Sequence, residues 1–163
     1  MLQAMRKRLE RDEDGFTLIE LMVVVLIIAI LLAIAIPTFL GARNRANQRA
    51  AQSSLRNALT GAKTIYTDNQ DYTQASAAAL ATGEPSLTFV VGTASSTDFK
   101  VVSVDATATG AWGAAALSKD NTCYYIYDNP GGGKGTFYGS TPNSSSTTCL
   151  GSAAAGTATL GKW

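Results

Sequence analysis

The 163 residues include no histidine, and the side chains singled out for possible chemistry are carboxylates and the two cysteines. Histidine is the commonest acid/base residue and the commonest metal ligand in proteins. Asp68 and Asp71 could in principle act as an acid/base pair, but two acids near a helix end are more often solvated loop residues. No nucleophile with a neighbouring base and no cluster of metal ligands stands out in the sequence. We therefore expect no catalytic residue, no bound metal, no cofactor and no enzymatic activity.

Glu20 is the carboxylate in the least ordinary position, because it lies near the start of an apolar run that lasts to about Leu40. The run is long enough to cross a bilayer as a helix, which takes about 20 residues. A charge at bilayer depth costs on the order of 3 kcal/mol, so it is usually paired and functional. The simpler interpretation is that a glutamate in the first turn of a helix complements the helix dipole.

The residues before the apolar run form a short charged leader, 1–15, with four basic and four acidic side chains. Positive charge on the cytoplasmic flank of a span fixes its orientation, so we expect the leader to stay inside and the rest to be exported. An ordinary secretory signal has a shorter apolar region of roughly 7–15 residues, followed by a small-residue cleavage site. An ordinary signal peptide and an uncleaved membrane anchor remain the two alternatives.

A charged leader, then Gly15-Phe16-Thr17-Leu18-Ile19-Glu20, then an apolar helix resembles the class III signal of type IV pilins and of the pseudopilins of type II secretion. The resemblance implies that a membrane-embedded prepilin peptidase cuts between Gly15 and Phe16 and then methylates the new amine of Phe16. Glycine suits a cleavage site because, without a Cβ, its backbone can approach another protein closely. In a filament, the amine of Phe16 would neutralise Glu20 of a neighbouring subunit, and such a buried pair is costly to break.

The resemblance further implies one N-terminal helix over 16–67, with 16–40 as the transmembrane and assembly segment. After about residue 42 the pattern becomes amphipathic. Its apolar stripe, which should pack on a sheet, consists of Leu55, Ala58, Leu59, Ala62, Ile65 and Tyr66. Pro37 removes one backbone hydrogen bond inside this helix, and Gly41 follows, so we predict a helix break there in the form of a kink or a weakened turn. Alternatively, the two residues simply mark the end of the membrane span.

The amphipathic segment also carries a basic surface, formed by Arg43, Arg45, Arg49 and Arg56. The simplest interpretation is a solvated helix face. A contact with the membrane surface or with DNA is the alternative, although the net charge of +1 gives no basic bias towards nucleic acid.

The segment 68–163 is predicted to be a globular β-sheet domain, which makes the whole chain an α+β protein with the pilin fold. A short helix over 76–80 is followed by five short segments rich in β-branched or aromatic residues, at 87–91, 99–104, 112–117, 122–127 and 135–138. Gly, Asn, Asp and Ser separate them, which favours a small antiparallel meander. The segment 129–133, Asn-Pro-Gly-Gly-Gly, is typical of a hairpin loop and lacks the Gly-Lys-Ser/Thr of a phosphate-binding loop.

Cys123 and Cys149 are the two cysteines of the chain, and both lie in the segment expected to be exported. An even pair in an exported domain predicts a disulfide, which would tie a C-terminal loop to the sheet. Two free buried cysteines are the alternative. The disulfide region also matches that of many type IV pilins, whereas major pseudopilins typically carry a calcium-binding loop. Asp128 is the only acid after Thr122, which favours a pilin.

The predicted function is therefore that of a structural subunit of a type IV pilus, which supports surface adhesion, twitching motility or DNA uptake. The alternatives are a major pseudopilin and a plain membrane-anchored exported domain. The expected partners are further copies in a helical filament, the prepilin peptidase, the pilus assembly platform with its ATPases, the membrane before assembly, and DNA or a surface ligand. The precursor is expected in the inner (cytoplasmic) membrane and the mature protein in an extracellular pilus at the cell surface.

Overall fold

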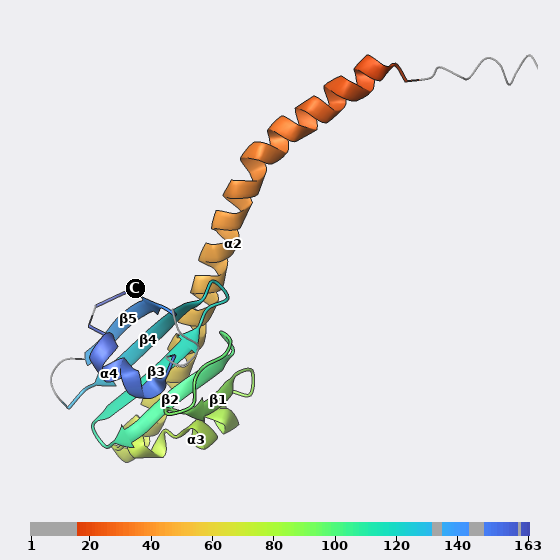
Figure 1. Ribbon diagram of the computed structural model, residues 1–163. Coiled ribbons are helices and arrows are strands. Elements are labelled where there is room, and N and C mark those ends of the chain that lie inside the picture. The colour runs from red at the N-terminus through yellow and green to blue at the C-terminus, as the bar shows by residue number, and fades with distance from the viewer. Residues whose placement is uncertain (1–15, 132–134, 144–148, 160) are drawn as a thin grey trace, which may run out of the picture. The chain divides into compact units, whose positions relative to one another are not determined.

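The computed structural model describes residues 16–131, 135–143, 149–159 and 161–163, which Figure 1 shows as a ribbon. The predicted leader, 1–15, lies outside the described residues, and so does Gly15 of the predicted cleavage site. The chain divides into two compact units, Met1–Ala42 and Arg43–Trp163. The boundaries predicted from the sequence, after residues 15 and 67, were placed at the expected cleavage site and at the expected end of the long helix. They stay predictions.

The long helix α2 (Leu18–Asn69) begins in the first unit and continues into the second. Its large apolar side chains between Leu18 and Leu40 are from 48% to 75% exposed, so none of them is buried within the described part of the chain. By length and composition, α2 is able to cross a membrane. A continuous apolar surface of this kind marks a contact with lipid or with another protein.

Pro37 and Gly41 both lie inside α2, and the helix continues through them to Asn69. Proline has no N–H, so the carbonyl of Ala33 loses its usual helical donor. One residue further on, the hydroxyl of Thr38 donates to the carbonyl of Ile34 at 3.1 Å. Neither Pro37 nor Gly41 ends the helix, and a locally weakened turn at this place stays a prediction.

In the second unit, α2 buries one face against the sheet. Four residues of the predicted apolar stripe, Leu55, Ala58, Leu59 and Ala62, are buried, and the other two, Ile65 and Tyr66, are partly buried. The helix ends two residues later than predicted. Gln70 takes a left-handed conformation with φ 54°, and its N–H donates to the carbonyl of Tyr66 at 2.7 Å, which closes the last turn.

Each of the five predicted strand segments is a strand of one sheet with the order β1-β2-β3-β4-β5. The strands are β1 (Thr88–Val91), β2 (Val101–Ala108), β3 (Ala111–Leu117), β4 (Thr122–Asn129) and β5 (Gly135–Pro142). Strands β2 to β5 form the expected antiparallel meander. The observed α+β architecture is the one predicted.

Strand β1 departs from the expected meander because it pairs with β2 in parallel, with Thr88 opposite Val101. A tight antiparallel hairpin needs a loop of two to five residues, whereas the segment 92–100 separates these two strands. That segment crosses the face of the sheet opposite α2. The N–H of Ser96 donates to the carbonyl of Cys149 at 2.9 Å. The hydroxyl of Ser103 donates to the carbonyl of Ala94 at 2.6 Å. The chain thereby returns to the end of the sheet from which β1 started.

Short helical elements connect and cover the sheet. Between α2 and β1 lie the 3-10 helix η1 (Tyr72–Gln74) and the helix α3 (Ala77–Gly83), and after β5 come η2 (Gly151–Ala153) and α4 (Ala154–Thr157). The predicted helix over 76–80 corresponds to α3, which Ser76 caps by accepting a hydrogen bond from the N–H of Ala79. The sequence pattern did not predict η1, η2 and α4.

The sheet has a core on each face. One core packs against α2 and contains Trp112, Ala114 and Ile126, while the other contains Ala115, Cys123 and the residues of α4. In Figure 1, α4 covers the face of the sheet that is turned away from α2. Strand β3 is buried on both faces, and small side chains let the covering segments come close. At Gly151, any Cβ would lie 2.6 Å from the carbonyl oxygen of Ser103, so only glycine fits there.

Candidate functional site

The first turn of α2 holds the conspicuous carboxylate in a reciprocal set of hydrogen bonds. The backbone N–H and the hydroxyl of Thr17 both donate to Oε2 of Glu20, at 2.8 and 2.7 Å. In return, the N–H of Glu20 donates to the hydroxyl oxygen of Thr17 at 3.3 Å. This arrangement is a capping box, which satisfies two backbone N–H groups that the start of a helix leaves without helical partners.

Sequence reasoning placed Glu20 correctly in the first helical turn but missed the role of Thr17. The signal was available, because Thr-x-x-Glu before an apolar run is the sequence pattern of a capping box. The capping box explains why a glutamate can stand at this position without any partner molecule. It does not explain why the helix that follows is apolar on all sides.

The capping box leaves half of the Glu20 carboxylate available. Within the described residues, Oε1 of Glu20 accepts no hydrogen bond from the protein. Glu20 and Phe16 also line one shallow hollow, together with Ile19, Val23 and Val24. The predicted assembly residues therefore lie side by side at the start of an apolar surface, with one carboxylate oxygen free to meet a cation.

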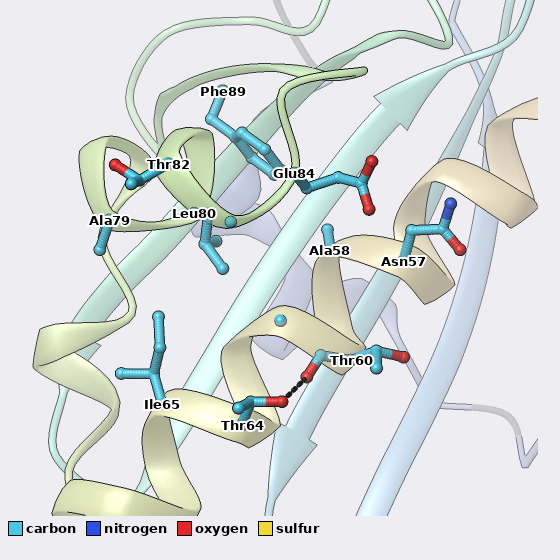
Figure 2. Close-up of a pocket in the computed structure, with 12 residues that line it drawn as sticks. Asn57, Ala58, Thr60, Thr64, Ile65, Ala79, Leu80, Thr82, Glu84 and Phe89 are labelled. Carbon is cyan, nitrogen blue, oxygen red and sulfur yellow. Dashed lines mark hydrogen bonds between the residues drawn. The ribbon is translucent and has the colours of Figure 1, made fainter.

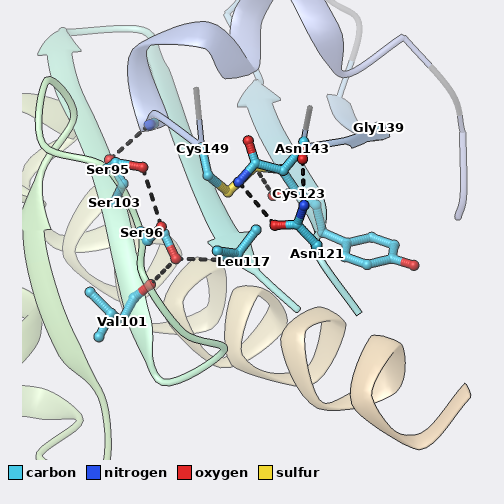
Figure 3. The surroundings of a disulfide bond; sticks show 12 residues. Ser95, Ser96, Val101, Ser103, Leu117, Asn121, Cys123, Gly139, Asn143 and Cys149 are labelled. Carbon is cyan, nitrogen blue, oxygen red and sulfur yellow. Dashed lines mark hydrogen bonds between the residues drawn. A yellow bond between two sulfur atoms is a disulfide. The ribbon is translucent and has the colours of Figure 1, made fainter. Parts of the chain in front are cut away.

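The second predicted feature is the disulfide, and it is confirmed. Cys123 of β4 and Cys149 are bonded across a separation of 26 residues, with their Cα atoms 5.5 Å apart. Figure 3 shows the hydrogen bonds in the surroundings of this bridge, among them those of Ser96 in the loop that precedes β2. The hydroxyl of Ser96 accepts from the N–H of Leu117 at 2.8 Å, and that of Ser103 accepts from the N–H of Gly151 at 2.8 Å. The bridge thus ties the C-terminal segment to the outer face of the sheet.

A buried acid that the sequence did not single out for a role connects α2 with the β4–β5 hairpin. Asp128 is 1% exposed; its Oδ2 accepts a hydrogen bond from the Tyr72 hydroxyl at 2.6 Å, and its Oδ1 lies 3.1 Å from Nζ of Lys63. Thr136 of β5 donates its hydroxyl to the same carboxylate. Burial raises the pKa of Tyr72, and the neighbouring Asp128 carboxylate raises it further. A carboxylate enclosed in this way has no room for a substrate, and its role is structural.

The two acids considered as an acid/base pair have separate positions. Asp71 caps η1, because its carboxylate accepts hydrogen bonds from the N–H and the hydroxyl of Thr73 at 2.8 and 2.7 Å. Asp68 is exposed near the end of α2. The predicted basic residues Arg43, Arg45, Arg49 and Arg56 are all exposed on α2. Within the described residues, none of these charged side chains lines a pocket together with another titratable group.

An exposed apolar helix at the start of the chain, followed by a helix-and-sheet domain with a disulfide, is the architecture of a pilin-like subunit. Residues 11–36 match the family described as the prokaryotic N-terminal methylation motif. The chain is 37% identical over 113 residues to the type IV wide pilus major component PilA4 of Thermus thermophilus, which covers 67% of this chain and 86% of that relative. The chain belongs to the type IV pilin family. No solved structure matches it significantly.

Proposed function

We propose that this pilin is the structural subunit of a type IV pilus filament and that copies associate through the apolar part of α2. The observation that supports this most directly is the uncovered surface of residues 16–40, on which every large apolar side chain is exposed. A contact that joins one face of a subunit to a different face of the next does not close on itself, so repetition builds a fibre. The printed name of the Thermus relative, a major component of a wide pilus, agrees with this role.

Maturation is the first step of the proposed function. The matched motif covers both sides of the Gly15–Phe16 bond, so we propose that a prepilin peptidase cuts this bond and methylates the amine of Phe16. Before assembly, the apolar part of α2 would lie in the cytoplasmic membrane. The mature subunit would then leave the lipid for a pilus at the cell surface, driven by a separate assembly platform and its ATPases.

Glu20 has two roles in this proposal. Within its own subunit it closes the capping box with Thr17 through Oε2. In the filament, its free Oε1 would accept the cationic amine of Phe16 from a neighbouring subunit. A charge inside an apolar bundle is tolerated when it is paired and hydrogen-bonded, so the two roles together would fix the axial alignment of neighbouring helices.

The proposed role is structural and not enzymatic. The outer face of the subunit would make the contacts of the pilus with its surroundings. Adhesion to a surface, twitching motility and DNA uptake are functions that such a fibre would support, with DNA or a surface ligand as the external partner. The outer face of the described domain is formed by the disulfide, α4 and the 92–100 loop. These segments are the ones to examine for a binding target.

The proposal is tested by the N-terminus and the location of the mature protein. Mass spectrometry of fibres sheared from cells should find a chain that begins with N-methylated Phe16, and electron microscopy of the same material should show filaments. A mature protein that still carries residues 1–15, or one that is never found in fibres, would contradict the proposal. Short fibres confined beneath the envelope, with a secretion defect on deletion, would favour a pseudopilin instead.

A further inference from the structure

The part of α2 in the second unit carries charge on one side of its buried stripe and a groove on the other. The first side, the basic flank, consists of Arg45, Arg49, Arg56 and Lys63. Spacings of four and seven residues bring these side chains to one side of a helix. The Arg56 guanidinium lies 5.2 Å from the centre of the Trp163 ring, and Nζ of Lys63 lies 3.0 Å from the hydroxyl of Thr136 in β5. The basic flank therefore borders β5 and the C-terminus.

The second side, the groove flank, borders α3 and β1. It consists of Asn57, Gly61, Thr64 and Asp68 of α2, with Glu84 at the end of α3. A groove of about 540 Å³ opens along it, between α2, α3 and Phe89 of β1. Figure 2 shows the Glu84 carboxylate on the side of this groove where Asn57 and Ala58 lie. The α2 wall of the groove is made mostly of small side chains, so another chain could approach the helix closely.

Apart from Lys63, the charges on the two flanks are not paired within the described residues. Among the described residues the structure contains one ion pair, Lys63 with Asp128. Arg45 and Arg49 are exposed and have no acidic partner, and Asp68 is exposed without a basic one. Glu84 accepts a hydrogen bond from the Ser86 hydroxyl but pairs with no cation. Unpaired positive charge thus lies on the basic flank at Arg45 and Arg49, and unpaired negative charge lies on the groove flank at Asp68 and Glu84. Arg43 is the exception, because it lies five turns before Gly61 on the groove side of α2, at the opposite end from Asp68.

We infer that the groove flank is the docking site for the basic flank of a second copy of this chain. The inference rests on the proposed pilus filament. A contact that joins one flank to the opposite flank of the next copy can be repeated head to tail, as the proposed filament requires. Arginine suits the contact, because its guanidinium can bind a carboxylate with two hydrogen bonds. Each copy would offer Arg45 and Arg49 to the acids of one neighbour and its own Asp68 and Glu84 to the other.

The inference is tested by reversing the charge of each flank in the full chain and measuring the yield of sheared filaments. The basic-flank variant carries Arg45→Glu and Arg49→Glu, and the acid-flank variant carries Asp68→Lys and Glu84→Lys. Each is expected to lower the yield about tenfold or more, because like charges repel at an interface. The fourfold variant restores unlike charges and should recover most of the wild-type yield. Lys100→Glu with Lys119→Glu is the matched control for the loss of positive charge away from both flanks.

Folding of each variant is checked by circular dichroism of the purified protein in detergent. If the acid-flank variant does not fold, the neutral variant Asp68→Asn with Glu84→Gln replaces it. This variant should lose less filament yield, and added salt should lower the yield of the wild type in the same way, because salt screens the charges. The inference is overturned if the basic-flank variant assembles as well as the control, or if the fourfold variant is no better than its parents. In either case wild-type filaments would remain, and the proposed function would stand. Absence of wild-type filaments would count against the proposed function itself.

Discussion

At the residue scale, Glu20 has a local role in the capping box with Thr17 and a proposed second role between subunits. The capping box uses the backbone N–H and the hydroxyl of Thr17 on one oxygen of Glu20. A glutamate held by its own turn is oriented before any neighbour arrives. The conformational entropy of this side chain is therefore already lost within the subunit, so the proposed filament contact would not have to order it.

A substitution of Thr17 tests the capping box directly. Thr17→Val keeps the shape of the side chain but removes the hydroxyl, and loss of such a cap costs about 1 kcal/mol. The N–H of Glu20, which donates to that hydroxyl oxygen, should then exchange with solvent faster by a factor of about 5. Amide exchange measured by NMR in detergent micelles reports this. Thr17→Ser keeps the hydroxyl and is the control; equal exchange in the two variants would show that the cap is not formed.

At the element scale, the second unit is held together by links on both faces of the sheet. Asp128 links Lys63 of α2, Tyr72 of η1 and Thr136 of β5. On the opposite face, the Cys123–Cys149 bridge closes a loop of 26 residues, which in the simple chain-entropy picture stabilises the fold by about 3.5 kcal/mol. The hairpin and the C-terminal segment are therefore each fixed by one polar or covalent link as well as by apolar packing.

The link through Tyr72 predicts a pH dependence of stability. Burial and the Asp128 carboxylate raise the pKa of Tyr72 above its ordinary value of 10.0, so the folded protein keeps this proton after the unfolded chain has lost it. The stabilisation is complete below pH 10 and is lost progressively as the pH rises above that value. Tyr72→Phe should therefore lower the free energy of unfolding at pH 8, by about 1–3 kcal/mol because an acceptor is left unpaired.

The measurement for this prediction is denaturant unfolding at a series of pH values, followed by tryptophan fluorescence. The wild type should lose stability between pH 10 and 12 more steeply than Tyr72→Phe. Tyr127→Phe, at a half-buried position on the other face of the sheet, is the control and should behave like the wild type. Parallel pH curves for the wild type and Tyr72→Phe would refute the role assigned to this hydroxyl.

At the scale of the whole molecule, the apolar part of α2 is not buried by any of the residues that the structure describes. The second unit buries its apolar residues in two cores of its own, whereas the surface of residues 16–40 stays exposed. Such a surface is expected to be covered by lipid or by another protein. The proposed exchange of lipid for sister helices would supply both covers.

Two substitutions of Glu20 separate its two roles at this scale. Glu20→Ala removes the capping carboxylate and the charge, while Glu20→Gln can keep the cap but not the charge. If pairing with the amine of Phe16 aligns the subunits, both variants should insert into the membrane normally and lose filaments. The expected loss is at least about a hundredfold, since an unpartnered buried charge costs about 3–5 kcal/mol. Membrane fractionation and counts of sheared filaments measure the two steps; normal filaments from Glu20→Gln would limit Glu20 to its capping role.

Prediction from the sequence succeeded where the signal is local or periodic. The apolar run follows from its length, the stripe around Leu55 and Leu59 from its helical spacing, and the five strand segments from their β-branched or aromatic residues between turn residues. The structure has all of them. The parallel pairing of β1 was missed, because the direction of a strand depends on where the connecting segment travels. The role of Asp128 was missed for a similar reason: its partners are contributed by α2, η1 and β5, which are remote in sequence.

The sequence by itself therefore determined the apolar helix, the carboxylate at its start and the pair of cysteines, because each is written in residue types along one short stretch or in their count. Only the tertiary structure decided the direction of β1, the enclosure of Asp128 and the two unlike flanks of α2. These depend on which surfaces the packed sheet covers and which it leaves open, and that choice is made by the competition of all segments for burial.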